Sequence, residues 1–371
     1  MSNIVIDGRE LTATGTGTYL KHLLSELQQL DRTNSYVVLL KPKDMEDWQP
    51  TNKNFTKVGC SYKEFTFGEQ IGLRKQLKHL QPDLVHFAMV QQPVLYRGRT
   101  ITTMHDLTTA RFRNPSKNWL VFIIKQALYK WVNRIAARKS KAILTPSAFV
   151  KDDVARFARI NSRKITVTYL AADKITEAPE AISELEGKSY VMYVGRPQPH
   201  KNLSRLVEAF VQLRQQYPEL HLVLVGKRDA LYRRLDKQLQ NQAIKNVHFM
   251  GFMNDGQLRW LYEHTKAYVF PSLSEGFGLP GLEAMAHDAP VVSSNATCLP
   301  EIYGDAAEYF DPLDVKAMIK AIAKVIDDDK RADQLRSLGK KQVATYSWQR
   351  TAEQTLAVYK RVLNDELPPA A

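Results

Sequence analysis

The sequence predicts an α/β protein made of two doubly wound domains, each with a parallel sheet at its centre. Short β-rich runs alternate with helical patterns along both halves of the chain. Such alternation is typical of β–α–β crossovers, in which helices cover both faces of a parallel sheet. The length of 371 residues is enough for two domains of ordinary size. Residues 171–188 are polar, contain Pro179 and Gly187, and are the best candidate for a linker.

The first half, residues 1–170, is expected to form a Rossmann-like domain. Its β-rich runs are short and apolar, and helical spacing of apolar residues separates some of them. The predicted strands are 3–7, 36–40, 83–87, 100–104 and 142–146, and the clearest helical patterns are 19–30 and 69–80.

The second half, residues 171–346, shows the cleaner alternation and predicts a second Rossmann-like domain. Its predicted strands are 190–195, 221–226, 246–251, 267–270 and 290–294. The last segment, residues 347–371, begins with an amphipathic helix over 347–363, and we expect it to pack back toward the N-terminal domain. Two doubly wound domains predict a cleft where the carboxyl ends of their strands face each other.

The composition is that of an ordinary globular protein, with 44% hydrophobic and 9% aromatic residues. No apolar run approaches the ~18 residues of a membrane-spanning helix. The first residues read directly into a strand, so we expect no cleaved secretion signal. Cys60 and Cys298 are far apart and lack CxxC spacing, which favours a reducing, cytoplasmic setting over a disulfide or zinc framework.

The positive charge of the chain is concentrated in its first half. Residues 1–170 hold 27 Lys and Arg against 13 Asp and Glu, whereas the remainder holds 25 against 26. Residues 107–151 contain ten basic residues, several aromatic residues and no acidic residue. Apolar side chains recur at helical spacing between Trp119 and Ile135.

This basic segment has three interpretations. It is a core helix with a basic solvated side, an element that binds an anionic membrane surface, or a nucleic-acid-binding element. We do not expect nucleic acid as a partner, because no helix-turn-helix, RNP or zinc-finger pattern accompanies the charge.

The segment that carries most chemical information is FPSLSEGFGLPGLEAMA, residues 270–286. A predicted strand ends there, and a loop with Gly276 and Gly278 leads into a helix whose first turn should hold Glu283. Such a helix N-terminus offers free N–H groups and a positive dipole end to a phosphate. Glu275 and Glu283 would repel a phosphate unless they bind other groups, such as sugar hydroxyls. The alternative is that Glu283 is an acidic cap of the helix.

A second segment, VGRPQPHKN at residues 194–202, places Arg196 and Lys201 after a strand. Doubly wound folds bind ligands at this edge of the sheet, and an Arg–Lys pair suits a diphosphate. The alternative is that both are solvated cations beside a loop.

Two weaker signals occur in the first half. Gly15 and Gly17 stand between the first strand and the first helix, in a loop that could approach a phosphate or a sugar, although the pattern is not GxGxxG. His105 and Asp106 come at the end of the strand predicted at 100–104. His105 could form a hydrogen bond with a substrate. The alternative is that it has a structural role. The nine histidines form no metal-ligand cluster in the sequence.

Together these motifs closely resemble glycosyltransferase family 4, whose members are retaining, nucleotide-sugar-dependent enzymes of the GT-B fold. The resemblance covers nearly the whole chain. It is carried by the 195–202 turn, by the two glutamates eight residues apart with PSLSEGFGLPGLEAMA around them, and by the following weaker segments: GTGTYL, HDL, NVHFMGF and PEIYGDAAEYFDP.

The resemblance implies roles for individual residues. Arg196 and Lys201 would bind the donor diphosphate, Glu275 the donor sugar and Glu283 the ribose, and His105 would meet the sugar from the other domain. The implied catalytic set is His105, Glu275, Arg196 and Lys201. The implied donor-binding set adds Gly15, Gly17, Gly251, Phe252, Gly276, Phe277, Gly278, Leu279 and Glu283.

Two of these groups have a specific implied task. The backbone amides from 276 to 279 would complete the phosphate site, and the Gly251–Phe252 turn would lie against the nucleobase. The chain departs from the family at Asp288, where Gly is usual, and at residues 171–173, where Gly-Val-Asp is frequent. Both departures fall in loops, so they concern local backbone geometry more than activity.

The function implied by the resemblance is transfer of a hexose from a nucleotide sugar to a glycan or lipid-linked acceptor, in polysaccharide biosynthesis. GDP-mannose is the favoured donor, followed by UDP-hexoses, and no metal or other cofactor is expected. The N-terminal domain would be the acceptor side, and residues 107–151 could hold the enzyme on the inner face of a membrane. The alternatives are a sugar-nucleotide epimerase of the same fold and a basic nucleic-acid-binding protein.

Overall fold

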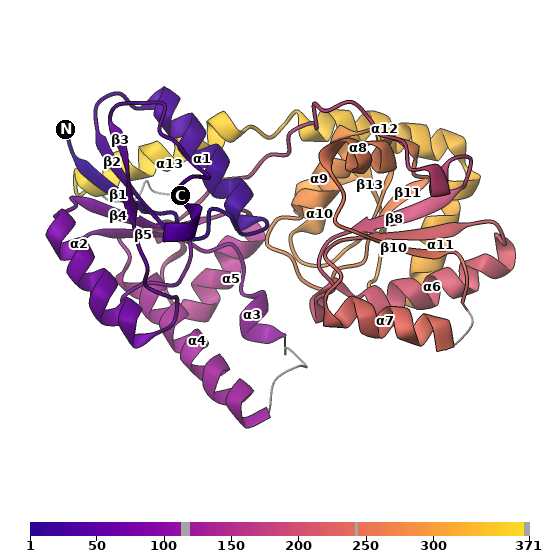
Figure 1. The fold of residues 1–371 in the computed structure, drawn as a ribbon, viewed down its shortest axis with the longest axis horizontal. Coiled ribbons are helices and arrows are strands. Elements are labelled where there is room, and N and C mark those ends of the chain that lie inside the picture. The colour runs from indigo at the N-terminus through magenta and orange to yellow at the C-terminus, as the bar shows by residue number, and fades with distance from the viewer. Residues whose placement is uncertain (113–118, 242–243, 367–371) are drawn as a thin grey trace. The chain divides into compact units, whose positions relative to one another are not determined.

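The computed structural model describes residues 1–112, 119–241 and 244–366 (Figure 1). These residues divide into two compact units. Among the described residues, the first unit comprises Met1–Arg111, residues 119–170 and residues 347–366, and the second comprises Phe112 with residues 171–241 and 244–346.

The first unit is built on a parallel sheet of seven strands in the order β3-β2-β1-β4-β5-β6-β7. Helices lie on both faces of the sheet (Figure 1). The strands are β1 (Asn3–Asp7), β2 (Ser35–Leu40), β3 (Phe55–Gly59), β4 (Leu84–Phe87), β5 (Thr100–Thr103), β6 (Ala142–Thr145) and β7 (Ile165–Val167). The helices are α1 (Thr16–Leu30), α2 (Arg74–Leu80), α3 (Thr108–Arg111), α4 (Trp119–Lys139), α5 (Ala148–Ala158) and α13 (Trp348–Leu363).

Helix α13 belongs to the first unit although it follows the second unit in the sequence. It packs along α1, where the rings of Trp348 and His22 stack with centroids 4.4 Å apart. Its buried residues recur at helical spacing, as an amphipathic helix requires.

The second unit is built on a parallel sheet of six strands in the order β10-β9-β8-β11-β12-β13. The strands are β8 (Tyr190–Val194), β9 (His221–Val225), β10 (Val247–Gly251), β11 (Ala267–Phe270), β12 (Val291–Ser294) and β13 (Ala307–Phe310). The helices are α6 (Leu203–Gln216), α7 (Ala230–Asn241), α8 (Asp255–His264), α9 (Leu279–Ala286), α10 (Leu299–Tyr303), α11 (Val315–Asp327) and α12 (Asp329–Val343).

Short turns of helix join these elements. They are η1 (Pro42–Asp44), η2 (Glu69–Leu73), η3 (Ser162–Lys164), η4 (Ser183–Leu185), η5 (Pro199–Lys201) and η6 (Gly304–Ala306). The helix expected over 69–80 therefore begins with a π-helical turn, η2, before α2.

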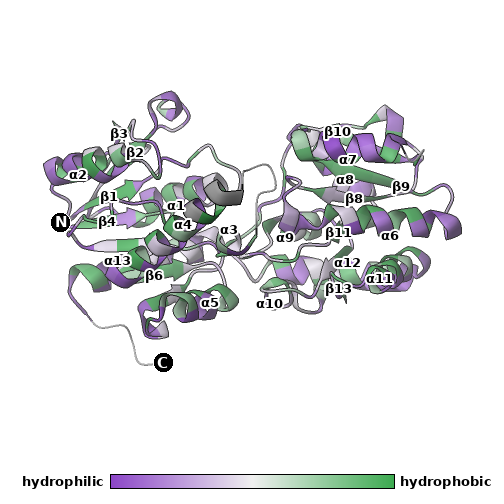
Figure 2. Ribbon diagram, turned by 90° about the horizontal axis from the view of Figure 1, so that it is seen from below, coloured by the Kyte–Doolittle hydropathy of each residue, from purple (hydrophilic) through white to green (hydrophobic). Residues whose placement is uncertain are grey.

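The central strands are buried on both faces, which explains why their sequences are continuous apolar runs rather than alternating ones. Helices pack one apolar face against them and expose the other, so that α6 carries both hydrophilic and hydrophobic colour in Figure 2. In the first unit, one side of the sheet packs α2 through Val5, Leu39, Leu73, Leu77, Val85 and Phe87. The same side packs α3, α4 and α5 through Met104, Leu107, Ala110, Ala137, Ile143, Val150 and Val154. Helices α1 and α13 lie on the opposite side, where Tyr19 and Tyr359 bond to Thr103 and His86.

The α/β class and the parallel sheets are as predicted, but three strands were missed. These are β3, β7 and β13, and all three lie at an edge of their sheet. An edge strand has one neighbour and is less enclosed than a central strand, so its sequence needs a weaker apolar pattern. In β3, for example, only Phe55 is buried.

Candidate active site

The predicted residues of the second unit gather at the carboxyl edge of its sheet, between β8, β11 and α9. Lys201 ends the turn η5, and its Nζ donates to Oε1 of Glu275 at 2.7 Å. The two side chains are only 18% and 12% exposed, and the ammonium also lies 5.5 Å from the ring centroid of Phe270. The structure therefore brings together a cation and a carboxylate that are 74 residues apart in sequence.

Asn202 explains how Lys201 is held in place. Its side chain is buried, and its Nδ2 donates to the carbonyl oxygens of Pro271 at 3.1 Å and Pro312 at 2.7 Å. These bonds tie η5 to the end of β11. The residue itself has a φ of 59°, which an Asn tolerates better than most residues. In the Lys-Asn pair of the motif, Lys201 is therefore the charged group and Asn202 is the residue that anchors it.

Arg196 follows β8 and is exposed at the same edge of the sheet. Gly195 precedes it with a φ of 149°, and a Cβ at this position would lie 2.6 Å from the hydroxyl of Tyr193. A glycine is therefore needed for the chain to pass over Tyr193 and present the Arg196 guanidinium beyond the strand.

The loop from 275 to 279 has a backbone that requires glycine at its end. Gly278 has a φ of 95°, and a Cβ there would lie 2.5 Å from the hydroxyl of Tyr303. That hydroxyl donates to the Gly278 carbonyl at 2.6 Å, which fixes the loop at the start of α9. The Phe277 side chain is buried against Tyr346, so only its backbone can take part in a phosphate site. The loop thus presents backbone N–H groups at a helix N-terminus, the arrangement that binds phosphate.

Glu283 does not lie where the sequence placed it. Helix α9 begins at Leu279 with Gly278 as its N-cap, and no acidic residue occupies its first turn. Glu283 lies one turn further along, so it is not an acidic cap of this helix. Burial, with the charge of Asp255, raises the pKa of its carboxyl to about 7. Such a carboxyl is suited to binding hydroxyl groups rather than to capping.

The Gly251–Phe252 turn begins at the last residue of β10, Gly251, which has a φ of 74°. The side chain of Phe252 is 89% exposed. The ring is therefore accessible to a planar ligand.

In the first unit, the glycine loop forms the N-terminus of α1. Gly15 is its N-cap, with a φ of 76°. A Cβ at Gly17 would lie 2.4 Å from the carbonyl oxygen of Leu11, so the loop closes only with glycine there. The Thr16 hydroxyl donates to the sulfur of Met89 at 3.5 Å, which places the loop beside the segment after β4.

His105 follows β5 at the carboxyl edge of the first sheet, where it is partly exposed. Its Nε2 lies 3.1 Å from the carbonyl oxygen of Ala88. Because a carbonyl only accepts, Nε2 carries the hydrogen and Nδ1 keeps its lone pair. Burial lowers the imidazole pKa to about 4, so His105 is neutral at physiological pH. The ring can therefore accept a hydrogen bond from a substrate hydroxyl at Nδ1.

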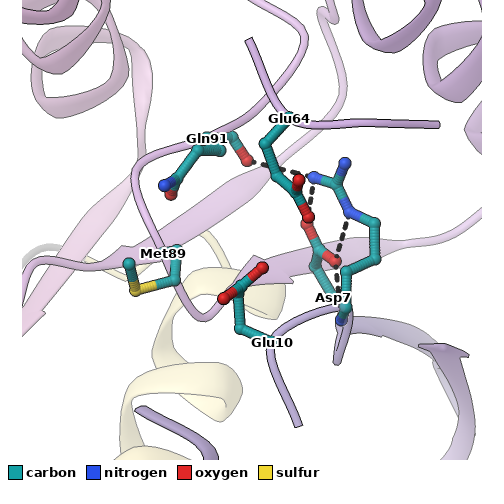
Figure 3. A pocket seen from close by; sticks show the side chains of 6 residues that line it. Asp7, Glu10, Glu64, Met89 and Gln91 are labelled. Atoms are coloured by element: carbon teal, nitrogen blue, oxygen red, sulfur yellow. Dashed lines mark hydrogen bonds and ion pairs between the residues drawn. The ribbon is translucent and has the colours of Figure 1, made fainter. Parts of the chain in front are cut away.

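A small cavity lies near the 15–17 loop and is lined in part by Asp7, Arg9 and Met89 (Figure 3). It borders an ion cluster that the sequence did not reveal. Arg9 is buried, and its guanidinium binds both oxygens of Asp7 at 2.7 and 2.8 Å and Oε1 of Glu69 at 2.9 Å. It also donates to the carbonyls of Tyr62 and Gln91. The cavity measures about 10 Å³, which is room for one water molecule and too little for a sugar. The cluster is therefore an anchor for the loops after β1, β3 and β4.

The basic segment 107–151 forms α3, α4 and β6 and includes the start of α5. Its residues 113–118, with Arg113 and Lys117, lie outside the described residues. Helix α4 exposes Ile123, Leu128 and Trp131 to 42%, 47% and 52%. Exposed cations accompany them at Lys125, Arg134 and Arg138. The solvated side of this helix is therefore both apolar and basic.

Among residues 1–112, 119–241 and 244–366, no three or more His, Cys, Asp and Glu side chains are grouped as a metal site would require. None of the helices described there has the length and apolarity needed to cross a membrane.

Comparison with known proteins identifies the family. Residues 13–174 match the family model described as glycosyltransferase family 4, and residues 174–342 match that described as glycosyl transferases group 1. The chain belongs to glycosyltransferase family 4. Its two Rossmann-like units are those of the GT-B fold, and the protein is a glycosyltransferase, as the sequence predicts.

Relatives of this glycosyltransferase include O-antigen chain mannosyltransferases. It is 31% identical to O-antigen chain mannosyltransferase B of Escherichia coli, over 71% of this chain and 70% of the relative. It is 28% identical to the O-antigen chain mannosyltransferase RfbU of Salmonella typhimurium, over 70% of each chain. Among solved structures, sucrose-phosphate synthase from Thermosynechococcus elongatus superposes with a TM-score of 0.78 at 18% identity, over 99% of this chain and 100% of the other.

Proposed function

We propose that this glycosyltransferase is a retaining mannosyltransferase that moves mannose from GDP-mannose to a glycan or lipid-linked acceptor. The observation that carries the proposal is the Lys201–Glu275 pair at the glycine loop before α9, with Arg196 at the same sheet edge. The preference for mannose is supported by the named activities of the two O-antigen relatives.

In the proposed reaction, negative charge grows on the diphosphate as it leaves the sugar. Arg196, Lys201 and the backbone N–H groups of the 276–279 loop stabilise that charge. Because these donors are held in place by glycine geometry and by Asn202, they need little rearrangement during the reaction. These protein cations take the part that a metal ion has in other transferases, so the proposal includes no metal.

The remaining residues bind the uncharged parts of the donor. Glu275 accepts hydrogen bonds from sugar hydroxyls, Glu283 binds the ribose, and Phe252 stacks on the base. Neutral His105 accepts a hydroxyl hydrogen at Nδ1. The acceptor oxygen bonds to the anomeric carbon on the face from which the diphosphate leaves, as the bond from that carbon to the diphosphate breaks and the acceptor proton passes to the leaving phosphate. The anomeric configuration is therefore kept.

A donor screen tests this function. The purified protein is incubated with GDP-mannose, UDP-glucose, UDP-galactose and UDP-N-acetylglucosamine, with and without mannosylated acceptors. Acceptor-dependent release of GDP, with an α-linked product from the α-linked donor, is the expected result. A β-linked product from GDP-mannose would contradict retention. Conversion of a donor to its epimer in the absence of acceptor would favour an epimerase. Transfer that survives excess EDTA supports a metal-independent reaction.

We also propose that the exposed face of α4 binds anionic lipid and so holds the enzyme on the inner face of the membrane. Support comes from the exposed Leu128 and Trp131 beside exposed cations, in a segment that lacks acidic residues. Apolar side chains would enter the headgroup region, and each cation near the surface adds about 1 kcal/mol.

Sedimentation with vesicles tests the membrane proposal. We expect more binding to phosphatidylglycerol-containing vesicles than to phosphatidylcholine vesicles, and weaker binding at high salt. Lys125→Gln should reduce partition about fivefold. Leu128→Ser should also reduce it, whereas Leu313→Ser, a matched change at an exposed leucine of the second unit, should not. Equal binding to both kinds of vesicle would refute the proposal.

A further inference from the structure

Four buried side chains of the first unit form a continuous chain of hydrogen bonds that ends beside His105. The Tyr359 hydroxyl lies 2.6 Å from Nδ1 of His86, and Nε2 of His86 lies 2.8 Å from the Thr103 hydroxyl. The Thr103 hydroxyl lies 3.0 Å from the Tyr19 hydroxyl. All four residues are at most 2% exposed. They come from α13, β4, β5 and α1, which are far apart in sequence.

The chemistry of these groups makes the three hydrogen bonds depend on one another. Burial lowers the His86 pKa to about 3, so this imidazole is neutral and has one N–H donor and one lone pair. Whichever ring nitrogen of His86 donates, the other accepts, so the bond to Tyr359 and the bond to Thr103 have linked directions. The Thr103 hydroxyl has one hydrogen, so its bond to Tyr19 follows the same direction.

The far end of the chain reaches the surroundings of His105. The ring of Tyr19 meets the His105 imidazole edge-on, with centroids 5.0 Å apart and planes at 77°. The bond between His86 and Thr103 joins the penultimate residue of β4 to the last residue of β5. Ala88, which accepts from His105, is two residues beyond His86, and His105 is two residues beyond Thr103. Both restraints on the His105 ring therefore depend on this chain.

We propose that Tyr359, His86, Thr103 and Tyr19 are positioning residues that hold the His105 imidazole in its orientation and tautomer. The proposal rests on the role of His105 in the proposed function. The proposal also means that the orientation of His105 depends on helix α13, because α13 supplies Tyr359 to the hydrogen-bonded network. A buried network of this kind fixes one geometry because each of its polar groups needs its partner.

The test uses full-length protein and the variant Tyr359→Phe, which keeps the ring and removes only the hydroxyl. Loss of one hydrogen bond of ordinary strength predicts a two- to tenfold lower kcat, with KM for the donor unchanged. Thr103→Val should have the same effect, and Thr103→Ser, which keeps a hydroxyl, should restore the wild-type rate. Tyr36→Phe is the matched control, because it removes a buried hydroxyl of the same unit that donates to Asp31. It should leave kcat unchanged.

Spectroscopy of the histidines separates positioning from a general loss of stability. In ¹⁵N-histidine-labelled protein, His105 should show the Nε2–H tautomer and His86 a single neutral tautomer, with resonances assigned by His105→Gln and His86→Gln. Tyr359→Phe should shift the His105 resonances, and Tyr36→Phe should not. Unchanged His105 resonances with unchanged kcat in both Tyr359→Phe and Thr103→Val would overturn the proposal. So would an equal loss of kcat in Tyr36→Phe.

The outcome for His105 itself keeps the two proposals distinct. If His105→Gln is inactive while Tyr359→Phe is fully active with an unchanged spectrum, the positioning inference fails and the proposed function stands. If His105→Gln transfers sugar at the wild-type rate, the role of His105 in the proposed function fails. The spectral shift in Tyr359→Phe then still reports whether the chain holds the ring.

Discussion

Lys201 and Glu275 form the residue-scale feature that bears most directly on activity. Their side chains are mostly buried and lie 2.7 Å apart, at a loop that also offers backbone N–H groups. An ion pair with this residual exposure contributes modestly to stability, because desolvation offsets much of the attraction. In the proposed function its use is chemical: Lys201 turns to the diphosphate, and Glu275 accepts sugar hydroxyls.

Removing either charge should abolish transfer with little effect on folding. Lys201→Ala removes a donor to the leaving diphosphate, and a loss of about 3 kcal/mol or more of transition-state stabilisation is expected, which is at least a hundredfold in kcat. Glu275→Ala should be similarly inactive. The melting temperature of each variant should stay close to that of the wild type in a thermal scan. Wild-type turnover in either purified variant would refute the assignment of the site.

Glu283 predicts how nucleotide binding and stability respond to pH. Its pKa is raised to about 7 from an ordinary value near 4.5, so the native state holds a proton that the unfolded state releases between these values. Its contribution to stability is therefore full below pH 4.5 and is lost as the pH rises to 7. Glu283→Gln should remove this slope and be the more stable protein at pH 8, as measured by urea unfolding at several pH values.

The same carboxyl predicts proton release on donor binding. Ribose hydroxyls donate to the ionised form, so binding of the nucleotide should strengthen as the pH rises from 6 to 8. Calorimetry in buffers of different ionisation enthalpy would measure the released proton. Glu283→Gln should bind more weakly and show no such pH dependence; a pH-dependent affinity that persists in this variant would assign the effect to another group.

At the scale of elements, the loop between β11 and α9 depends on the backbone of Gly278. Gly278→Ala would adopt an unfavourable φ of 95° and place a Cβ 2.5 Å from the Tyr303 hydroxyl. We expect the free energy of unfolding to fall by about 2–3 kcal/mol, and the affinity for the nucleotide to fall with it. Gly187→Ala is the matched control, because it has a φ of 71° and no atom within 4 Å of the added Cβ. It should cost about 1 kcal/mol and leave nucleotide binding intact, as denaturation and calorimetry would show.

Elements also show how far a sequence pattern predicts structure. The central strands could be found because burial on both faces demands a continuous apolar run, as in HLVLV of β9. The missed strands β3, β7 and β13 lie at sheet edges, where pairing with one neighbour is enough. Glu283 was expected in the first turn of α9 but lies just beyond it, because the helix begins one residue before Pro280, at Leu279, after the left-handed backbone of Gly278.

At the scale of the whole molecule, the end of the chain completes the unit in which the chain begins. Helix α13 buries Trp348, Leu356, Val358, Tyr359 and Val362 to 8% exposure or less. Each such side chain contributes about 1.5–3 kcal/mol when buried, so together they are comparable to the stability of a domain. A chain ending at Tyr346 should therefore lose hydrogen-exchange protection in α1 and β1. Retained protection in α1 would show that the first unit folds without α13.

The sequence by itself determined the α/β class, the family, the charge asymmetry and the identity of the charged and glycine residues of the site. These follow from local periodicity and from spacing within one loop, which need no knowledge of distant contacts. Only the tertiary structure decided that Lys201 is held by Glu275 and anchored by Asn202, that Arg9 joins three loops, and that Tyr359 reaches the neighbourhood of His105. Each of these depends on which strands lie side by side and which groups become buried together, because a charge or hydroxyl that folding removes from water needs a partner that only the folded chain supplies.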